Sequence, residues 1–214
     1  MARHLKLIIF DLDGTLVDAY RAVWLSLNAA FQKLGFKKVS YKRVKESVGW
    51  GEKIFVSKFV GLQDVDKVLL LYRAHHRKAL TKGVRLLPGA KKLIAQLKKE
   101  DYRLAIASNR PTVFCELILK KLKLRKYFDV VVCADRVRHP KPAGDILKKI
   151  LKQLSVKPAE AVYVGDMTVD VQTGHRAKVK TIAVTTGSSK RSAILKAKPF
   201  KVIPRLNQLQ NRLH

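Results

Sequence analysis

The sequence predicts an α/β fold, in which a doubly wound parallel sheet carries an inserted all-helical domain. From Pro88 onwards, short apolar runs alternate with helical patterns, as the strands and crossover helices of a parallel sheet do. Between residues 18 and 81 the pattern is helical throughout, and no strand signal interrupts it. We therefore assign residues 1–15 and 83–214 to the core domain and residues 16–82 to the helical domain.

The first strand is expected at Leu5–Phe10, an apolar run that ends in the polar turn Asp11-Leu12-Asp13-Gly14. The helical region begins with apolar residues spaced by three and four, and Gly35 is a good stop for this first helix. Further helices of the insert are expected at Tyr41–Val48, Glu52–Val60 and Asp64–Leu80.

Four helix–strand pairs follow Pro88-Gly89. The helices are expected at Ala90–Lys99, Thr112–Leu122, Ala143–Leu154 and Val169–Ala177. Their strands are expected at Arg103–Ala107, Asp129–Cys133, Ala161–Val164 and Thr181–Val184. Phe200–Ile203 is expected as an edge strand and Pro204–Leu213 as a last helix.

The charge balance is strongly basic. Lys and Arg number 45 against 16 Asp and Glu, which gives a formal net charge of +29 over 214 residues. Basic pairs are spread along the helical patterns, whose charged faces usually point to water, so we favour a solvated basic surface. Steering of a small anionic substrate is the first alternative, and nucleic acid, which we do not expect as a partner, is the second.

The cysteines and the N-terminus point to a cytoplasmic protein. Cys115 and Cys133 each lie in an apolar run, which favours two buried, reduced thiols over a disulfide or a metal site. The apolar run before Asp11 ends too early for a signal segment, and no stretch is long enough to span a membrane. We expect no membrane partner, and a monomer or homodimer.

Polar side chains gather where the predicted strands end, which is where open α/β sheets bind their ligands. They are Asp11, Asp13, Ser108, Asn109, Lys141, Asp166 and Asp170. Asp11 and Asp13 stand two apart in an extended segment, so both carboxylates can face one ligand, and Gly14 lets the backbone approach it closely.

This set of groups suits a phosphate ester and a metal ion. Carboxylates without a His or Cys partner favour Mg²⁺ over Zn²⁺. Ser108, at the head of a helix, and Lys141 add anion-binding groups to the same edge, so a phosphate can bridge Mg²⁺ and Lys141. An aspartate in such a site can act as a nucleophile.

At this point the chain resembles the haloacid dehalogenase-like hydrolase superfamily, in its subgroup with a helical cap and a Rossmann-like core. Four motifs carry the resemblance in order: Asp11-Leu12-Asp13-Gly14-Thr15-Leu16-Val17-Asp18, Ser108-Asn109-Arg110-Pro111, Lys141-Pro142 and Gly165-Asp166-Met167-Thr168-Val169-Asp170. Val48-Gly49-Trp50-Gly51 and the Ser108 motif look most like phosphoglycolate phosphatases. Ala143-Gly144 after the lysine and His175-Arg176-Ala177-Lys178 after the last motif depart from the usual pattern.

The resemblance implies a Mg²⁺-dependent phosphatase with a small phosphorylated substrate. It implies that Asp11 is the nucleophile and that Asp13 first protonates the leaving group and then activates water. Mg²⁺ would be held by the Asp11 carboxylate, the backbone carbonyl of Asp13 and Asp166, with Asp170 beside it. The phosphate would be held by Ser108 and Lys141, with Asn109 in support and Gly14 close by.

Several side chains near these motifs have less certain roles. Trp50, between two glycines, either lines the substrate pocket or fills the small core of the cap, and we take it as a substrate candidate. Arg110 is interpreted as one of many surface arginines, with a substrate role as the lesser alternative. Asp18 is interpreted as a helix cap. His75-His76 has no acidic partner at ligand spacing, which disfavours a metal role.

Rival functions stay open at this stage. A phosphomutase or a pyrophosphatase would use the same nucleophile. A dehalogenase is disfavoured, because Asp13 and the metal ligands would be useless to it. A nucleic-acid-binding protein on a retired hydrolase fold would explain the charge, but the intact set of site residues argues against it.

Overall fold

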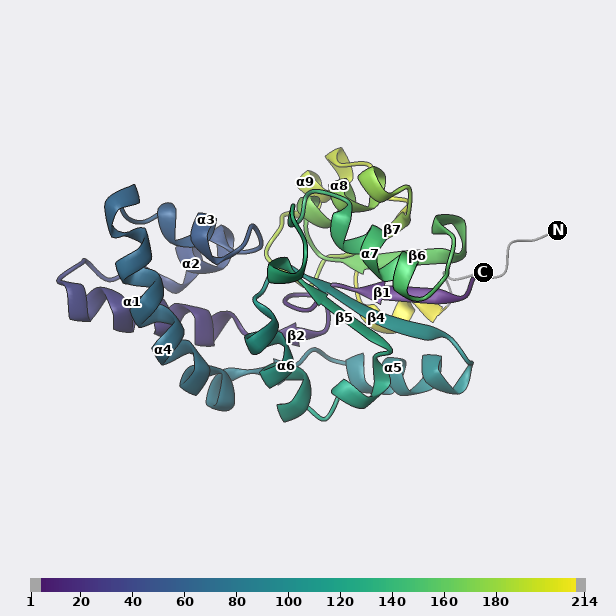
Figure 1. Ribbon diagram of the computed structural model, residues 1–214, viewed down its shortest axis with the longest axis horizontal. Helices are drawn as coiled ribbons and strands as arrows, with labels where there is room; N and C mark the ends of the chain where they lie inside the picture. Colours follow the sequence, from purple (N-terminus) through teal and green to yellow (C-terminus); the bar gives the residue numbers. More distant parts are fainter. Residues whose placement is uncertain (1–4, 211–214) are drawn as a thin grey trace.

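A six-stranded parallel sheet forms the centre of the molecule in the computed structural model, which describes residues 5–210 (Figure 1). The strands are β1 (Leu7–Phe10), β4 (Arg103–Ser108), β5 (Val130–Cys133), β6 (Ala161–Gly165), β7 (Lys180–Val184) and β8 (Lys201–Ile203). Their order in the sheet is β5-β4-β1-β6-β7-β8, and every pair is parallel. The predicted fold class is confirmed.

Alternation of side chains along β1 explains why both faces of the sheet are covered. Ile8 and Phe10 pack with α5 (Ala90–Lys99) and α6 (Thr112–Lys121), whereas Leu7 and Ile9 pack with α7 (Asp145–Gln153) and with the end of α8 (Thr168–Ala177). Figure 1 shows α5 and α6 below the sheet and α7 and α8 above it, together with α9 (Arg191–Lys196). All four residues of β1 are fully buried, as expected for the middle of a parallel sheet.

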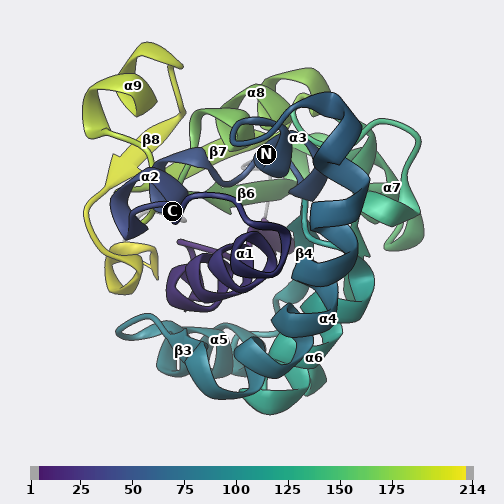
Figure 2. The same cartoon turned by 90° about the vertical axis from the view of Figure 1, so that its left-hand side faces the viewer.

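The helical region forms a cap beside the carboxyl ends of the strands (Figures 1 and 2). Its helices are α1 (Tyr20–Leu34), α2 (Tyr41–Ser47), α3 (Glu52–Ser57) and α4 (Val65–Gly83). They share an apolar cluster of their own, which includes Leu27, Phe31 and Phe55. The last turns of α4 leave this cluster, since Ala79 and Leu80 pack with the core instead.

The two connections between cap and core run side by side. Here β2 (Val17–Asp18) pairs antiparallel with β3 (Arg85–Leu86). The exposed Arg85 guanidinium also pairs with the Asp18 carboxylate, and that carboxylate accepts a bond from the N–H of Tyr20 at the start of α1. The N-cap position of α1 is Ala19, which makes no side-chain cap hydrogen bond, so Asp18 contacts the start of the helix from one residue before the predicted cap position. The division into residues 1–15, 16–82 and 83–214 stays a prediction.

Three features differ from the predictions. The β2–β3 ribbon and α9 were not expected, because each is too short to show a periodic pattern. The helix expected at Pro204–Leu213 is wrong over the described residues: the chain makes only a 3₁₀ turn there, and residues 211–214 lie outside them. The 3₁₀ segments are Leu62–Asp64, Arg125–Tyr127, Ala134–Arg136, Pro158–Glu160 and Leu206–Gln208.

Two expectations about the whole chain can be compared with the structure. Cys115 and Cys133 are both buried and both free, as predicted. None of the helices between residues 5 and 210 combines the length and the apolar character needed to cross a bilayer.

Candidate active site

The strand order explains why distant motifs meet. β4, β1 and β6 are neighbours, so the residues at their carboxyl ends lie at one edge of the sheet. Ser108 ends β4, Asp11 follows β1, and Asp166 follows β6. All three side chains are buried, at 2%, 7% and 0% exposure, so they face the interior of the site and not bulk water.

Lys141 is the centre of a buried group of charges. Its Nζ donates to Asp11 Oδ1 and to Asp170 Oδ1, each at 2.7 Å, and to the hydroxyl of Tyr163 at 3.0 Å. Burial alone would lower the pKa of Lys141, but the Asp11 and Asp170 carboxylates outweigh it and raise this pKa well above its usual range. The lysine is therefore fixed in its charged form beside the predicted nucleophile.

Asp11, Asp166 and Asp170 form a buried carboxylate cluster, with one oxygen from each lying within 4.8 Å of the others. Burial, opposed by Lys141, raises the pKa of Asp11 to about 7, and burial with Asp170 raises that of Asp166. With all three ionised and Lys141 charged, the group carries a formal charge of −2. Closely spaced oxygen ligands with this excess suit a hard divalent cation, so the residues fit Mg²⁺.

Asp166 and Asp170 differ in the number of hydrogen bonds that their carboxylates accept. Asp170 accepts four hydrogen bonds, from Lys141, Tyr163 and the backbone N–H groups of Asp166 and Met167. Asp166 accepts only one hydrogen bond at each carboxylate oxygen, from the Thr15 hydroxyl at 3.1 Å and from the Ser188 N–H at 3.3 Å. Asp166 thus retains more capacity for a metal, and Asp170 orients Lys141.

Asp13 turns its carboxylate away from this cluster and towards Arg110. The guanidinium donates through Nε to Oδ2 and through Nη2 to Oδ1, each at 2.8 Å. The side chain of Arg110 is only 9% exposed, so its interpretation as a surface arginine is wrong. Burial opposes its charge, but Asp13 more than compensates and raises the pKa of Arg110.

A hydrogen-bonded chain continues from Arg110 into the cap. Arg110 Nη1 lies 2.7 Å from Nε2 of the fully buried His76 on α4, and His76 Nδ1 lies 3.0 Å from the Ser26 hydroxyl on α1. Because an arginine can only donate, Nε2 must accept and Nδ1 carries the proton. Burial, with Arg110, lowers the pKa of His76 to about 2, so the ring is neutral.

Ser108 and Asn109 have different tasks. The Ser108 hydroxyl accepts from the N–H of Arg110 at 3.2 Å and keeps its own proton for a ligand. Asn109 exchanges two hydrogen bonds of 2.9 Å with the backbone of Lys141 and donates another of 3.1 Å to the carbonyl of Gly49. Asn109 therefore positions the lysine and ties a cap loop to the core, and its support of the phosphate stays a prediction.

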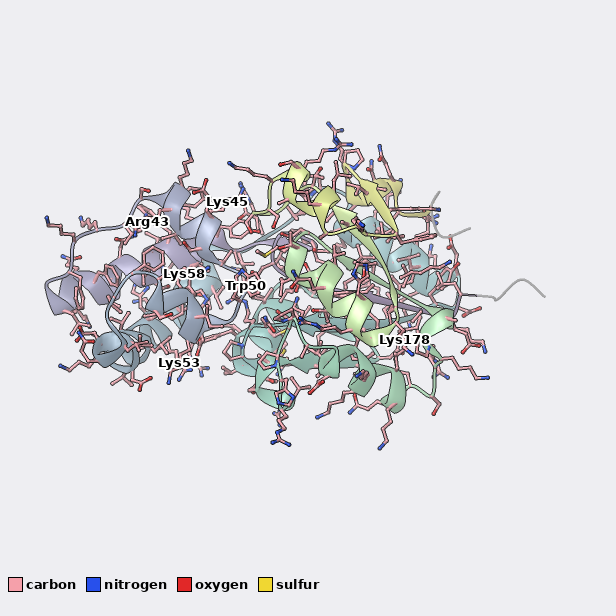
Figure 3. The ribbon with its side chains drawn as sticks, turned by 90° about the horizontal axis from the view of Figure 1, so that it is seen from above. Arg43, Lys45, Trp50, Lys53, Lys58 and Lys178 are labelled. Carbon is pink, nitrogen blue, oxygen red and sulfur yellow. The ribbon has the colours of Figure 1, made fainter. Side chains whose placement is uncertain are left out.

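A cavity of about 710 Å³, including its open mouth, lies between this site and the cap. Its apolar and aromatic lining residues are Tyr20, Val23, Val48, Phe55, Tyr72, Pro111, Phe114, Met167 and Val169. Gly49 and Gly51 line it but Trp50 does not, although Trp50 lies at the junction of cap and core (Figure 3). At Gly49, φ is +103°, a conformation that favours glycine, and a Cβ there would require the end of the Met167 side chain to move.

The pattern of the haloacid dehalogenase-like hydrolase family matches residues 8–184. The chain belongs to this family. The match covers all four motifs and the intervening cap, so it includes every predicted site residue. The predicted family and a hydrolase of the phosphatase type are thus confirmed.

Relatives and solved structures extend the comparison. The chain is 28% identical over 183 residues to a phosphoglycolate phosphatase of Aquifex aeolicus, covering 86% of each chain. It is 29% identical to the pyrophosphatase PpaX of Bacillus mycoides, covering 94% of each. The crystal structure of a predicted phosphoglycolate phosphatase from Haemophilus somnus has the same fold, with a TM-score of 0.92, 23% identity and 98% of each chain covered.

Three residues of the site were missed or misjudged from the sequence: Arg110, His76 and Tyr163. Tyr163 is a hydroxyl-bearing residue in the otherwise apolar strand β6, and this contrast could have indicated a site residue. His76 gave no such signal, since its partners are 34 and 50 positions away.

Proposed function

We propose that the protein is a Mg²⁺-dependent phosphatase that hydrolyses a small phosphate monoester through an aspartyl-phosphate on Asp11. The observation that carries this proposal is the buried group of three carboxylates, two of them bound by Lys141, next to Ser108 and beside the cavity beneath the cap. Such a group supplies both a nucleophile and the charges that hold a phosphate.

In the first half-reaction Asp11 attacks the phosphorus, and the bond between phosphorus and the ester oxygen breaks. Asp13 gives a proton to the departing alkoxide, and Lys141 and Ser108 hold the non-bridging oxygens. In the second half-reaction Asp13 takes a proton from the attacking water, and inorganic phosphate leaves Asp11.

Mg²⁺ would be held by Asp11, Asp166 and the backbone carbonyl of Asp13, with Asp170 beside it. Its contribution is to neutralise charge on the transferring phosphoryl group. Asp166 accepts fewer hydrogen bonds than Asp170, which supports Asp166 as the stronger metal ligand of the two.

The lining of the cavity supports a substrate with an uncharged organic part. Arg110, the cation nearest to Asp13, uses three of its five N–H groups on Asp13 and His76, and its charge is paired with that of Asp13. The cap contributes Glu52, which pairs with Arg73, together with aromatic rings. We therefore rank a sugar phosphate ahead of phosphoglycolate, because the carboxylate of phosphoglycolate would face Glu52 without a free cation.

The same reasoning disfavours a pyrophosphatase, the activity that one relative's name carries. Pyrophosphate has a phosphate as its leaving group, which requires several cationic or N–H donors on the cap side of the site. The residues that line the cavity there are mainly apolar. A phosphomutase shares the nucleophile, and we distinguish it by its product.

The nucleophile is tested by Asp11→Asn. We expect the variant to lose turnover by at least ~10⁴-fold, as an enzyme does when an essential nucleophile is removed. The assay is release of inorganic phosphate from an aryl phosphate and from a panel of sugar phosphates, phosphoglycolate and pyrophosphate. Recovery of an isomeric sugar phosphate in place of free phosphate would support the mutase.

The metal is tested in the same assay. Activity should require Mg²⁺, and Ca²⁺ should inhibit, because calcium prefers a larger and looser shell of oxygens. Full activity in excess EDTA would refute the metal assignment, and steady turnover by a homogeneous Asp11→Asn preparation would refute the nucleophile.

A further inference from the structure

Two hydroxyl groups next to the carboxylate cluster are buried and lack a hydrogen-bond partner. Over residues 5–210, three buried side-chain atoms are in this position: Tyr20 Oη, Ser188 Oγ and Thr181 Oγ1. Thr181 Oγ1 lies against Gly174, away from the site. Tyr20 and Ser188 both lie beside Asp166, so their lack of partners concerns the site itself.

Gly14 shows how closely Tyr20 approaches Asp166. A Cβ at Gly14 would lie 2.4 Å from Tyr20 Oη and 2.5 Å from Asp166 Oδ2, so the two oxygens face the same small space. Gly14 has φ +86°, a conformation that glycine adopts without strain. This packing gives Gly14 a second reason to be glycine, besides the close backbone approach expected from the sequence.

Ser188 reaches the same carboxylate from the loop after β7. Its backbone N–H donates to Asp166 Oδ2 at 3.3 Å, while its hydroxyl is unpaired. The hydroxyls of Tyr20 and Ser188 are near enough for Ser188 to lower the pKa of Tyr20, but they make no hydrogen bond of normal geometry. The Tyr20 hydroxyl oxygen can accept a hydrogen bond from a water molecule in this space.

The position of Tyr20 in the chain links this space to the cap. Tyr20 is the first residue of α1, the first helix of the cap, and its side chain is 4% exposed. The ammonium of Lys45, on α2, lies 5.1 Å from the centre of its ring. Two cap helices therefore fix the ring whose hydroxyl points towards Asp166.

We propose that Tyr20, assisted by Ser188, is a positioning residue for the metal site: its hydroxyl hydrogen-bonds to water carried by the divalent cation that Asp11 and Asp166 hold. Water bound to a cation donates its protons and needs acceptors around it, and the buried hydroxyl oxygens of Tyr20 and Ser188 have no partner. The inference rests on the proposed metal site. It adds a link between the start of the cap and metal affinity.

The test is Tyr20→Phe, which removes one oxygen atom and leaves the ring. We expect the Kd for Mn²⁺, measured by the loss of its free-ion spin-resonance signal, to rise about 10-fold, the lower end of the ~10–100-fold range for such outer partners. Ser188→Ala should give a smaller rise. Tyr41→Phe, which removes an exposed hydroxyl on α2, should leave the Kd unchanged.

Thermal unfolding supplies a second measurement that separates this role from a structural one. Without metal, Tyr20→Phe should be at least as stable as the wild type, because the phenylalanine leaves no hydroxyl unpaired. In saturating Mg²⁺ the variant should gain less in Tm than the wild type. A lower Tm of the metal-free variant would show that the hydroxyl has a protein partner, and the proposal would be overturned.

Asp166→Asn separates failure of this inference from failure of the proposed function. If the wild type binds no Mn²⁺, or if Asp166→Asn binds it equally well, the metal site itself is wrong. If Asp166→Asn loses Mn²⁺ while Tyr20→Phe binds it like the wild type, the metal site stands and only the role of Tyr20 is refuted.

Discussion

Asp13 and Arg110 meet through two hydrogen bonds that use both carboxylate oxygens, each at 2.8 Å. Such a paired contact fixes the plane of the carboxylate as well as its position. To donate a proton and later to accept one, Asp13 must free one of these oxygens from Arg110 and be protonated there. The remaining bond to Arg110 keeps the side chain in place during both steps.

Replacement of Asp13 by alanine tests the proton transfers. Turnover should fall by roughly the ~10²–10⁴-fold typical of a general acid–base group. The loss should be smaller for aryl phosphates with good leaving groups, because their departure needs no proton. The measurement is kcat over a series of leaving groups, with burst kinetics to identify the slow step. An equal loss across the series, where the first chemical step is rate-limiting, would speak against the role.

The sequence predicted which charged groups meet but not which pairs they form. Asp11, Ser108 and Asp166 could be brought together because their strands end at one edge of the sheet. The pairing of Asp13 with Arg110 could not be predicted, since 97 positions separate them and one of many arginines had to be chosen. Only the packed structure makes that choice.

At the scale of elements, the loop after β4 joins the core site to the cap at two points. Arg110 and Asn109 are adjacent in this loop: the first reaches His76 on α4 and the second reaches the carbonyl of Gly49. These two contacts start from the residues that hold Asp13 and Lys141. Movement of the cap would therefore disturb the positions of both Asp13 and Lys141.

Arg110→Ala tests the link between loop and cap. Breaking a buried ion pair costs ~3–5 kcal/mol, and we expect about 3 kcal/mol here because Asp13 keeps some contact with solvent. The matched control is Arg85→Ala, which breaks the exposed pair with Asp18 on the β2–β3 ribbon and should cost only ~0–1 kcal/mol. The measurement is the free energy of unfolding in urea, together with kcat for alkyl and aryl phosphates.

The two variants should differ in activity as well. Arg110→Ala should show the same dependence on leaving group as Asp13→Ala, but with a smaller loss, because the carboxylate is still present. Arg85→Ala should show no such dependence on the leaving group. Equal effects of the two variants on stability and on activity would mean that Arg110 has no special role.

The helices and strands were predicted best where they are long and patterned. The helix at Ala90–Lys99 agrees at both ends, and each predicted core strand is present with an end shifted by at most one residue, apart from β1, which begins two residues later than expected. The helix expected from Ala143 begins instead at Asp145, after Gly144, one of the departures from the family pattern. The β2–β3 ribbon depends on pairing between residues far apart in the chain, which no local pattern shows.

At the scale of the whole molecule, positive charge is distributed over both domains. Figure 3 shows Arg43, Lys45, Lys53 and Lys58 on the cap and Lys178 on the core. The buried cluster itself is negative, so the basic surface surrounds an acidic centre. A solvated surface, steering of an anionic substrate and a polyanionic partner remain as alternatives, and they differ in their response to salt.

Steering is tested by varying ionic strength. The Debye length falls from ~30 Å at 0.01 M to ~8 Å at 0.15 M, so a long-range attraction is largely screened over this range. If the net charge of +29 raises the capture rate of the substrate, kcat/KM should fall several-fold while kcat changes little, because kcat does not include the encounter. The measurement is both constants for the preferred sugar phosphate at saturating Mg²⁺. A kcat/KM that does not change with ionic strength would mean that the net charge serves only to solvate the surface. Competition by an oligonucleotide at low concentration and physiological salt would favour a polymer and contradict the small substrate.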